Sequence, residues 1–159
     1  MIELRKISIL SDDMKDCIEL EVTEEQRDFV AHNATSLGQA YALNKHGGCA
    51  VPYSIYAGGK MVGFIMYEYI LYENEDTYGE DCYYFWRFMV DKSQQGKGYG
   101  KAALTQVLDE IKQKPHGEAA HCYVSYEPEN VVSQKLYAGF GFVETDQIID
   151  GEQVARLKT

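Results

Sequence analysis

The sequence predicts a mixed α/β fold of the α+β type, in which helices flank a mostly antiparallel sheet with a central parallel pair of strands. Segments rich in β-branched and aromatic residues alternate with helical segments, and the chain closes with a hairpin. Strands separated by helices favour parallel pairing, whereas hairpins are antiparallel. The 159 residues are enough for one full-sized core, and no repeat or Pro/Ser-rich linker divides them. We therefore expect a single domain over residues 1–159.

The first third of the chain carries helix signals after one strand. Met14, Cys17 and Ile18 fall at helical spacing, and the sequence TEEQ at 23–26 has the spacing of a capping box. The glycine pair at 47–48 is typical of a helix end. In chain order we expect a strand at 2–9, a short helix capped by Asp12 or Asp13, a helix opened by 23–26, and a helix near 36–43.

The rest of the chain reads as strands, two hairpin turns and two helices. Gly58-Gly59 and Asp150-Gly151 are hairpin signals. The apolar residues from Leu104 to Ile111 follow the i, i+3, i+4, i+7 pattern of an amphipathic helix, which Pro115 and Gly117 end. We expect strands at 51–57, 61–71, 82–90, 120–126, 142–149 and 152–157, an acidic loop at 72–81, and a short helix at 130–138 ended by Gly139.

Composition narrows the function classes. A net charge of −10 argues against nucleic acid as a partner and permits a cationic substrate. No apolar run reaches the ~18 residues of a membrane span, and charges interrupt the first ten residues, so we expect a cytoplasmic protein without a membrane partner. The four cysteines lack zinc-ligand spacing, so we expect free thiols and no metal. We expect a homodimer, the commonest assembly.

A glycine-rich loop is the strongest functional signal. Glycine occupies every second position from Gly96 to Gly100, in a loop between a predicted strand and the start of a helix. Main-chain N–H groups and the helix dipole favour an anion at such a place. The dinucleotide fingerprint fails because Lys101 replaces its third glycine. The P-loop motif fails at Gln95 and Ala102. The loop therefore predicts an anion site of another kind, unless it is only a turn that starts a helix.

Two segments carry a family resemblance. The stretch QGKGYG, residues 95–100, fits [RQ]-x-x-G-x-[GA] and resembles the pyrophosphate-binding loop of GNAT acetyltransferases, which hold acetyl-coenzyme A. NVVSQKLYAGFGF, residues 130–142, matches the family pattern N-x-x-[AS]-x-x-L-Y-x-x-x-G-F. The resemblance covers nearly the whole chain. It implies pantetheine contacts from the backbone of Phe88, Met89 and Val90, pyrophosphate contacts from the amides of Gln95, Gly96, Lys97, Gly98, Tyr99, Gly100 and Lys101, and cofactor contacts from Asn130 and Ser133.

Tyr137, in the second motif, is the predicted catalytic acid. When an amine attacks a thioester, coenzyme A leaves as a thiolate, and a tyrosine hydroxyl can donate a hydrogen bond and then its proton. The alternatives are structural: Tyr137 is a core tyrosine bonded to the backbone, and Asn130 is only a helix N-cap.

The general base has no obvious candidate. A primary amine is mostly protonated at pH 7, so a proton must be removed. Relatives often place a Glu or His on the strand before the glycine loop. Alternation along that strand puts Tyr84, Trp86 and Phe88 on one face and Arg87 on the other. Glu68, on the preceding strand, is the candidate that remains, acting through water.

The predicted acceptor is a polyamine. Segments 20–42 and 85–104 resemble bacterial spermine/spermidine (diamine) N-acetyltransferases of the GNAT type, and several carboxylates can hold a polycation. Tyr84 and Trp86 can form an aromatic wall by cation–π contact, or simply pack in the core. Open alternatives are another amine (an aminoglycoside or a protein N-terminus), a non-catalytic acyl-CoA sensor, and a protein-interaction module. The candidate carboxylates, each also readable as solvated surface, are Glu21, Glu24, Glu25, Glu68, Glu73 and Glu75.

Overall fold

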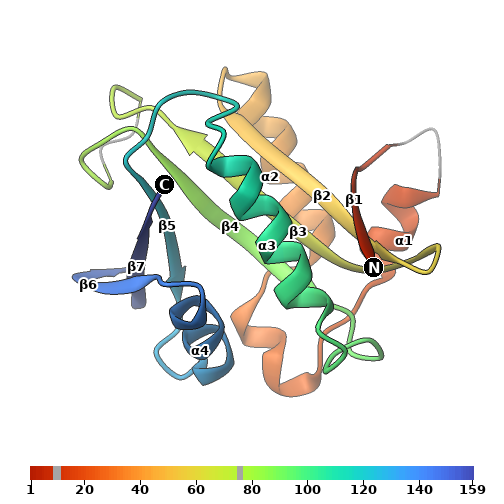
Figure 1. Ribbon diagram of the computed structural model, residues 1–159. Helices are drawn as coiled ribbons and strands as arrows, with labels where there is room; N and C mark the ends of the chain where they lie inside the picture. Colours follow the sequence, from red (N-terminus) through yellow and green to blue (C-terminus); the bar gives the residue numbers. More distant parts are fainter. Residues whose placement is uncertain (9–11, 75–76) are drawn as a thin grey trace.

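The computed structural model describes residues 1–8, 12–74 and 77–159 (Figure 1). Most predicted elements are present with ends shifted by a few residues. The first strand stops at Lys6, and the helix opened by 23–26 is a 3₁₀ helix, which its intact capping box begins. The elements are β1 (Ile2–Lys6), α1 (Asp13–Glu19), η1 (Glu24–Phe29), α2 (Asn33–Lys45), β2 (Cys49–Ala57), β3 (Lys60–Ile70), β4 (Cys82–Val90), α3 (Tyr99–Ile111), β5 (His121–Tyr126), α4 (Val131–Gly139), β6 (Val143–Ile149) and β7 (Glu152–Lys158).

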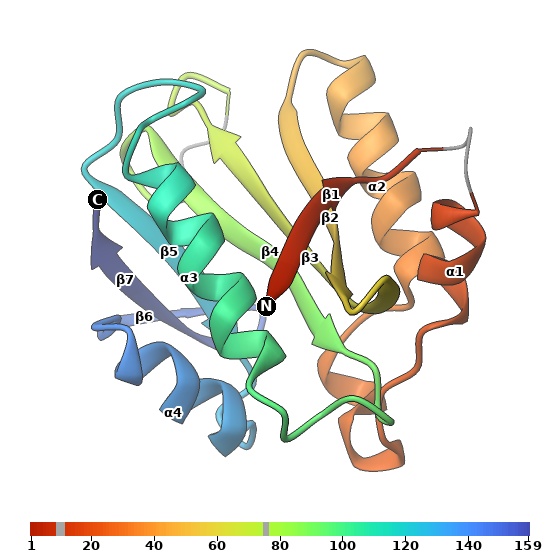
Figure 2. The ribbon, with the colours of Figure 1, turned by 45° about the vertical axis from the view of Figure 1, so that its right-hand side comes forward.

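One seven-stranded sheet organises the molecule, in the order β1-β2-β3-β4-β5-β7-β6. Every neighbouring pair is antiparallel except β4 and β5, which are parallel. The predicted fold class is therefore confirmed. Helices α3 and α4 cover one face of the sheet, and α1 and α2 cover the other (Figures 1 and 2). No helix of the described ranges is long and apolar enough to cross a bilayer.

Each face of the sheet has its own apolar core. On the α3 side, Leu104, Val107 and Ile111 are fully buried against the sheet, as the helical spacing predicts. On the α1 and α2 side, Cys17 and Ala40 pack on Phe64 and neighbouring strand residues. Burying a side chain of leucine size contributes about 1.5–3 kcal/mol. Strands β3 and β4 lie between these two cores in the middle of the sheet.

A bulge in β4 changes which way its side chains face. Met66 pairs with Arg87 and Tyr67 pairs with Phe85, so Trp86 is an extra residue in the ladder. Trp86 packs on the α1 and α2 core, and Arg87 lies opposite Met66 of that same core. Phe88 packs on the other core. The prediction that Phe88 shares a face with Trp86 and that Arg87 lies opposite is wrong, because strict alternation does not survive a bulge.

The parallel pair separates directly at this bulge. Only three residues of β4 pair with β5, and the last register pair is Phe85 with Val124. Within the described chain, β5 therefore offers no ladder partner to Trp86–Val90. Main-chain N–H and C=O groups need partners when buried. The second half of β4 thus presents a strand edge to the space between the two strands.

Candidate active site

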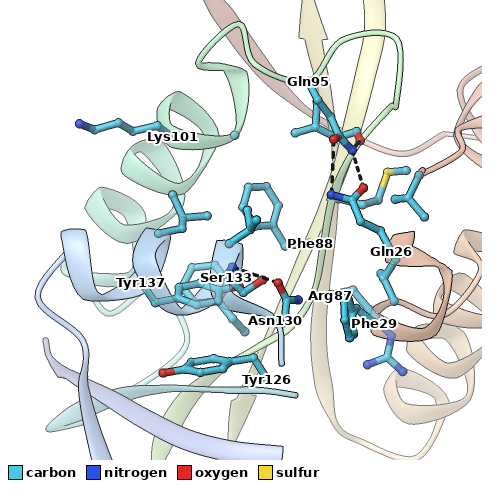
Figure 3. A pocket seen from close by; sticks show the side chains of 18 of the residues that line it. Gln26, Phe29, Arg87, Phe88, Gln95, Lys101, Tyr126, Asn130, Ser133 and Tyr137 are labelled. Carbon is cyan, nitrogen blue, oxygen red and sulfur yellow. Dashed lines mark hydrogen bonds between the residues drawn. The ribbon is translucent and has the colours of Figure 1, made fainter. Parts of the chain in front are cut away.

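A cavity of about 500 Å³ fills the space where β4 and β5 diverge. The second half of β4, the glycine loop with the start of α3, the start of α4, and the segment from Gln26 to Ala31 surround it (Figure 3). The structure brings most of the predicted site residues to this one cavity: Tyr84, Trp86, Phe88, Met89, Val90, Gln95, Gly96, Gly98, Tyr99, Gly100, Lys101, Asn130, Ser133 and Tyr137.

The glycine loop places free amide groups at one end of the cavity. Gly96 and Gly98 have φ values of 76° and 79°, a left-handed conformation that favours glycine, and Gly98 is the N-cap of α3. A Cβ at Gly100 would lie 3.3 Å from the Phe88 ring, so glycine lets α3 approach β4 closely. Among the described residues, no amide of residues 95–101 donates a hydrogen bond to the protein. Convergent free donors at a helix N-terminus suit a pyrophosphate.

Gln95 anchors this loop through its side chain. Its Nε2 donates to the Val90 carbonyl at 3.0 Å and to Gln26 Oε1 at 2.7 Å, while Gln26 Nε2 returns a 3.4 Å bond to Gln95 Oε1 (Figure 3). Gln26 also closes the capping box of η1. The sequence analysis did not single out Gln26, because its partner lies 69 residues away. The glutamine pair ties η1 to the glycine loop.

The two predicted lysines lie apart from the centre of the cavity. Lys97 donates to Gln94 Oε1 at 2.9 Å, is exposed, and is not among the cavity-lining residues. Lys101 lines the rim, and its side chain extends over the outer side of α3 in Figure 3. The amides, rather than these ammonium groups, therefore dominate the loop's inner surface.

The start of α4 forms another wall. Asn130 Oδ1 accepts from the Ser133 amide at 3.1 Å, so Asn130 is the N-cap of the helix (Figure 3). Both residues also line the cavity. Asn130 therefore has the N-cap role that the sequence offered as the alternative to cofactor binding. The N-cap bond leaves the Asn130 side-chain NH₂ group and the Ser133 hydroxyl available to a ligand.

Tyr137 is buried beside the cavity with its hydroxyl unbonded. Its ring stacks on Tyr126 at 5.9 Å between centroids and meets Phe142 edge-on at 5.5 Å. In the chain as described, the Tyr137 hydroxyl makes no hydrogen bond, so it is not held by the backbone. Burial raises the pKa of Tyr137 above the ordinary tyrosine value. The hydroxyl therefore keeps its proton at neutral pH and can donate it.

A hydrogen-bonded chain of side chains from β4, β5 and β7 lines the cavity. The Tyr84 hydroxyl lies 2.9 Å from Ser125 Oγ, and Ser125 Oγ donates to the carboxylate of Glu152. All three residues line the cavity. Glu152 was missed by the sequence analysis because β7 pairs with β5 only in the folded sheet. No local motif marks it.

Five of the six predicted acceptor carboxylates lie outside the cavity lining. Glu21 is exposed and pairs with Lys92, and Glu24 pairs with Arg27. Together with Glu25, Glu68 and Glu73 they are absent from the cavity lining, and Glu75 lies outside the described residues. Their substrate roles stay predictions. The carboxylates that do line the cavity are Asp28 and Glu152.

Arg87, on β4, brings a positive charge to the cavity lining. Its Nη1 donates to the Trp86 carbonyl at 2.8 Å and its Nη2 to Gln39 at 3.2 Å. Its Nε is buried without a partner among the described residues. Burial lowers the pKa of Arg87. The cavity lining therefore combines aromatic, anionic and cationic side chains. Trp86 and Arg87 come from the bulged part of β4.

Comparison with known proteins settles the family. Residues 9–142 match the model of the acetyltransferase (GNAT) family. The chain belongs to the GNAT family. This GNAT chain is 27% identical over 150 residues to spermine/spermidine N(1)-acetyltransferase of Bacillus subtilis (strain 168), covering 93% of the chain and 94% of that relative. A probable spermine N(1)-acetyltransferase of Bacillus subtilis subsp. natto matches at the same identity and coverage.

Solved structures share the GNAT fold. The GNAT domain of S. lividans PAT superposes with a TM-score of 0.74 at 17% identity, covering 99% of this chain and 90% of that one. Aminoglycoside acetyltransferase AAC(6')-Ib, solved in complex with coenzyme A, gives a TM-score of 0.73 at 13% identity, covering 99% and 95%. GNAT proteins with this fold thus act on different acceptors, and the fold by itself does not select among them.

Proposed function

We propose that this GNAT protein transfers the acetyl group of acetyl-CoA to a primary amine of a polyamine such as spermine or spermidine. The observation that carries the proposal is the full-length similarity to relatives named for those substrates. The cavity supports it, because Asp28 supplies a carboxylate and Phe29 and Trp86 supply aromatic surface. An alkyl chain with ammonium groups suits such a lining.

The residues present fit acetyl-CoA. The free amides of residues 95–101 would hold its pyrophosphate, and the open edge of β4 from Phe88 to Val90 would pair with the pantetheine arm. Asn130 and Ser133 would contact the same arm from α4. When bound, acetyl-CoA supplies an acetyl group activated as a thioester.

Tyr137 would supply the proton for the departing thiol. Tyr137 lines the cavity, its hydroxyl has no hydrogen-bond partner among the described residues, and the raised pKa keeps its proton in place at neutral pH. The buried site strengthens a hydrogen bond from this hydroxyl to a developing negative charge on sulfur.

Release of free thiol from acetyl-CoA, followed across a panel of amines, tests the function. We expect kcat/KM for spermidine and spermine to exceed that for aminoglycosides and for peptides with a free N-terminus by roughly a hundredfold, about 2.7 kcal/mol of differential transition-state binding. Equal values across the panel would remove the polyamine assignment. Tight binding of acetyl-CoA without turnover on any amine would indicate an acyl-CoA sensor instead.

A further inference from the structure

The two cavity tyrosines differ in where their hydroxyl protons point. The Glu152 carboxylate only accepts hydrogen bonds, so Ser125 must donate its single proton to it. Ser125 Oγ can then only accept from Tyr84, 2.9 Å away. With its own proton committed to Ser125, Tyr84 can offer the cavity only a lone pair. Tyr137, with no protein partner among the described residues, can offer a proton.

We propose that Tyr84, Ser125 and Glu152 form a relay that removes the proton lost by the acceptor amine, with the Tyr84 oxygen as the contact and Glu152 as the terminal acceptor. The relay rests on the proposed function, transfer to an amine. The base candidate that the sequence left was Glu68. Glu68 is on the neighbouring strand, in register with Tyr84, but does not line the cavity.

The surroundings of the relay suit this role. Tyr84 is half-buried, and burial raises its pKa, so its hydroxyl is neutral at physiological pH. The positive charge of Arg87 and a hydrogen bond with Tyr78 oppose that rise. A tyrosine oxygen has two lone pairs, so one remains for an amine even when Tyr78 occupies the other. Among the described residues, the charged or titratable groups outside the relay that act on it are Arg87, Tyr78 and Tyr137.

The protons balance along this route. The protonated amine first loses one proton to solvent; as the amide then forms, the neutral nitrogen gains a bond to the acetyl carbon and loses a second proton, while sulfur keeps the electron pair of the broken C–S bond. Tyr84 receives the nitrogen's proton as its own passes to Ser125, and that of Ser125 passes to Glu152. Tyr137 supplies the proton that sulfur takes up. Exchange with solvent then removes the proton from Glu152 and restores that of Tyr137.

Substitution along the relay tests it. We expect Glu152→Gln, Ser125→Ala and Tyr84→Phe each to lower kcat by roughly 100- to 1,000-fold, with KM and the Kd of coenzyme A changed less than about threefold. Ser125→Thr keeps the hydroxyl and should restore most of the activity. The double variant Tyr84→Phe/Glu152→Gln should be no slower than the worse single variant, since the residues act as one unit. Glu118→Gln, an exposed carboxylate outside the cavity, is the matched control.

A second readout needs neither acetyl-CoA nor an acceptor. In protein labelled with ¹³C at tyrosine Cζ, the Tyr84 resonance is identified by its absence in Tyr84→Phe. Ser125→Ala should shift it, and Ser125→Thr should leave it near its original position. A Tyr84 resonance that does not move in Ser125→Ala would overturn the relay even if wild-type turnover is normal. So would a Glu152→Gln variant that raises KM with kcat intact, because Glu152 would then only hold a cation. A wild type inactive on every amine, with the resonance shift present, would instead contradict the proposed function.

Discussion

At the scale of single residues, hydrogen-bond partners separate two tyrosines that share one cavity. Tyr137 comes from α4 and has no partner for its hydroxyl in the described chain, whereas Tyr84 comes from β4 and is bonded to Ser125. Burial raises the pKa of both. The direction of their hydrogen bonds therefore decides which of the two can donate a proton to the cavity and which can accept one.

Tyr137→Phe tests the acid at this scale. The substitution keeps the stacked ring and removes only the hydroxyl, so we expect kcat to fall by roughly 100- to 1,000-fold while the Kd of coenzyme A stays within about threefold. Steady-state kinetics and calorimetric titration measure the two quantities. Tyr41→Phe, at an exposed position on α2, is the control and should match the wild type. Full turnover by Tyr137→Phe would show that the thiolate leaves without this proton.

At the scale of elements, the sequence predicted the features that depend on residues close together in the chain. The α3 periodicity, both hairpin turns and the glycine loop lie close to where the sequence placed them, since each depends on neighbouring residues. The β4 bulge at Trp86 was missed because CYYFWRFMV contains no glycine or other signal of an extra residue. Glu152 was missed because the register of β5 with β7 brings it to the site.

Gly98→Ala tests the junction of the glycine loop and α3. A Cβ at Gly98 meets no atom within 4 Å, so the effect comes from its φ of 79° alone. An alanine in that left-handed conformation costs about 1–2 kcal/mol, and any relief of the strain turns the free amides away from a common point. We expect lower stability and a Kd for coenzyme A raised by roughly tenfold, about 1.4 kcal/mol.

Gly38→Ala is the matched control for this substitution. Gly38 lies inside α2, also meets no atom within 4 Å, and has no left-handed φ. Alanine there should raise the free energy of unfolding by about 0.5–1 kcal/mol and leave coenzyme A binding unchanged. Urea unfolding and calorimetry measure both variants. The same stability change for the two substitutions would contradict the conformational argument.

At the scale of the whole molecule, buried tyrosines make the stability of the fold sensitive to pH above about 10. The chain has 13 of them, and many have their hydroxyls held inside the structure. Tyr67 and Tyr53 both donate to Glu110, at 2.7 and 3.0 Å, and Tyr123 donates to Glu80 at 2.7 Å. Burial, reinforced by these carboxylates, raises the pKa of each, to about 12 for Tyr53 and Tyr123.

These raised tyrosine pKa values predict that the protein loses stability as the pH rises into the alkaline range. In the unfolded chain tyrosine titrates near pH 10. Above that pH the unfolded state releases protons that the folded state still holds, so the folded state binds more protons and the free energy of unfolding falls as pH rises. Below about pH 10 both states keep these protons, and the tyrosines contribute no slope. We therefore expect stability that is insensitive to tyrosine ionisation at pH 8–9 and declines steadily from about pH 10 to about pH 12.

Urea unfolding at pH 8, 9, 10, 11 and 12 measures this decline. Tyr123→Phe removes one proton that the folded state retains, so its stability should fall less steeply with pH than that of the wild type, even if it starts lower because Glu80 loses a bond. Tyr41→Phe should keep the wild-type slope, since that ring is largely exposed in the folded chain. A wild-type stability that is flat to pH 12 would mean that the buried hydroxyls ionise as freely in the folded protein as in the unfolded chain.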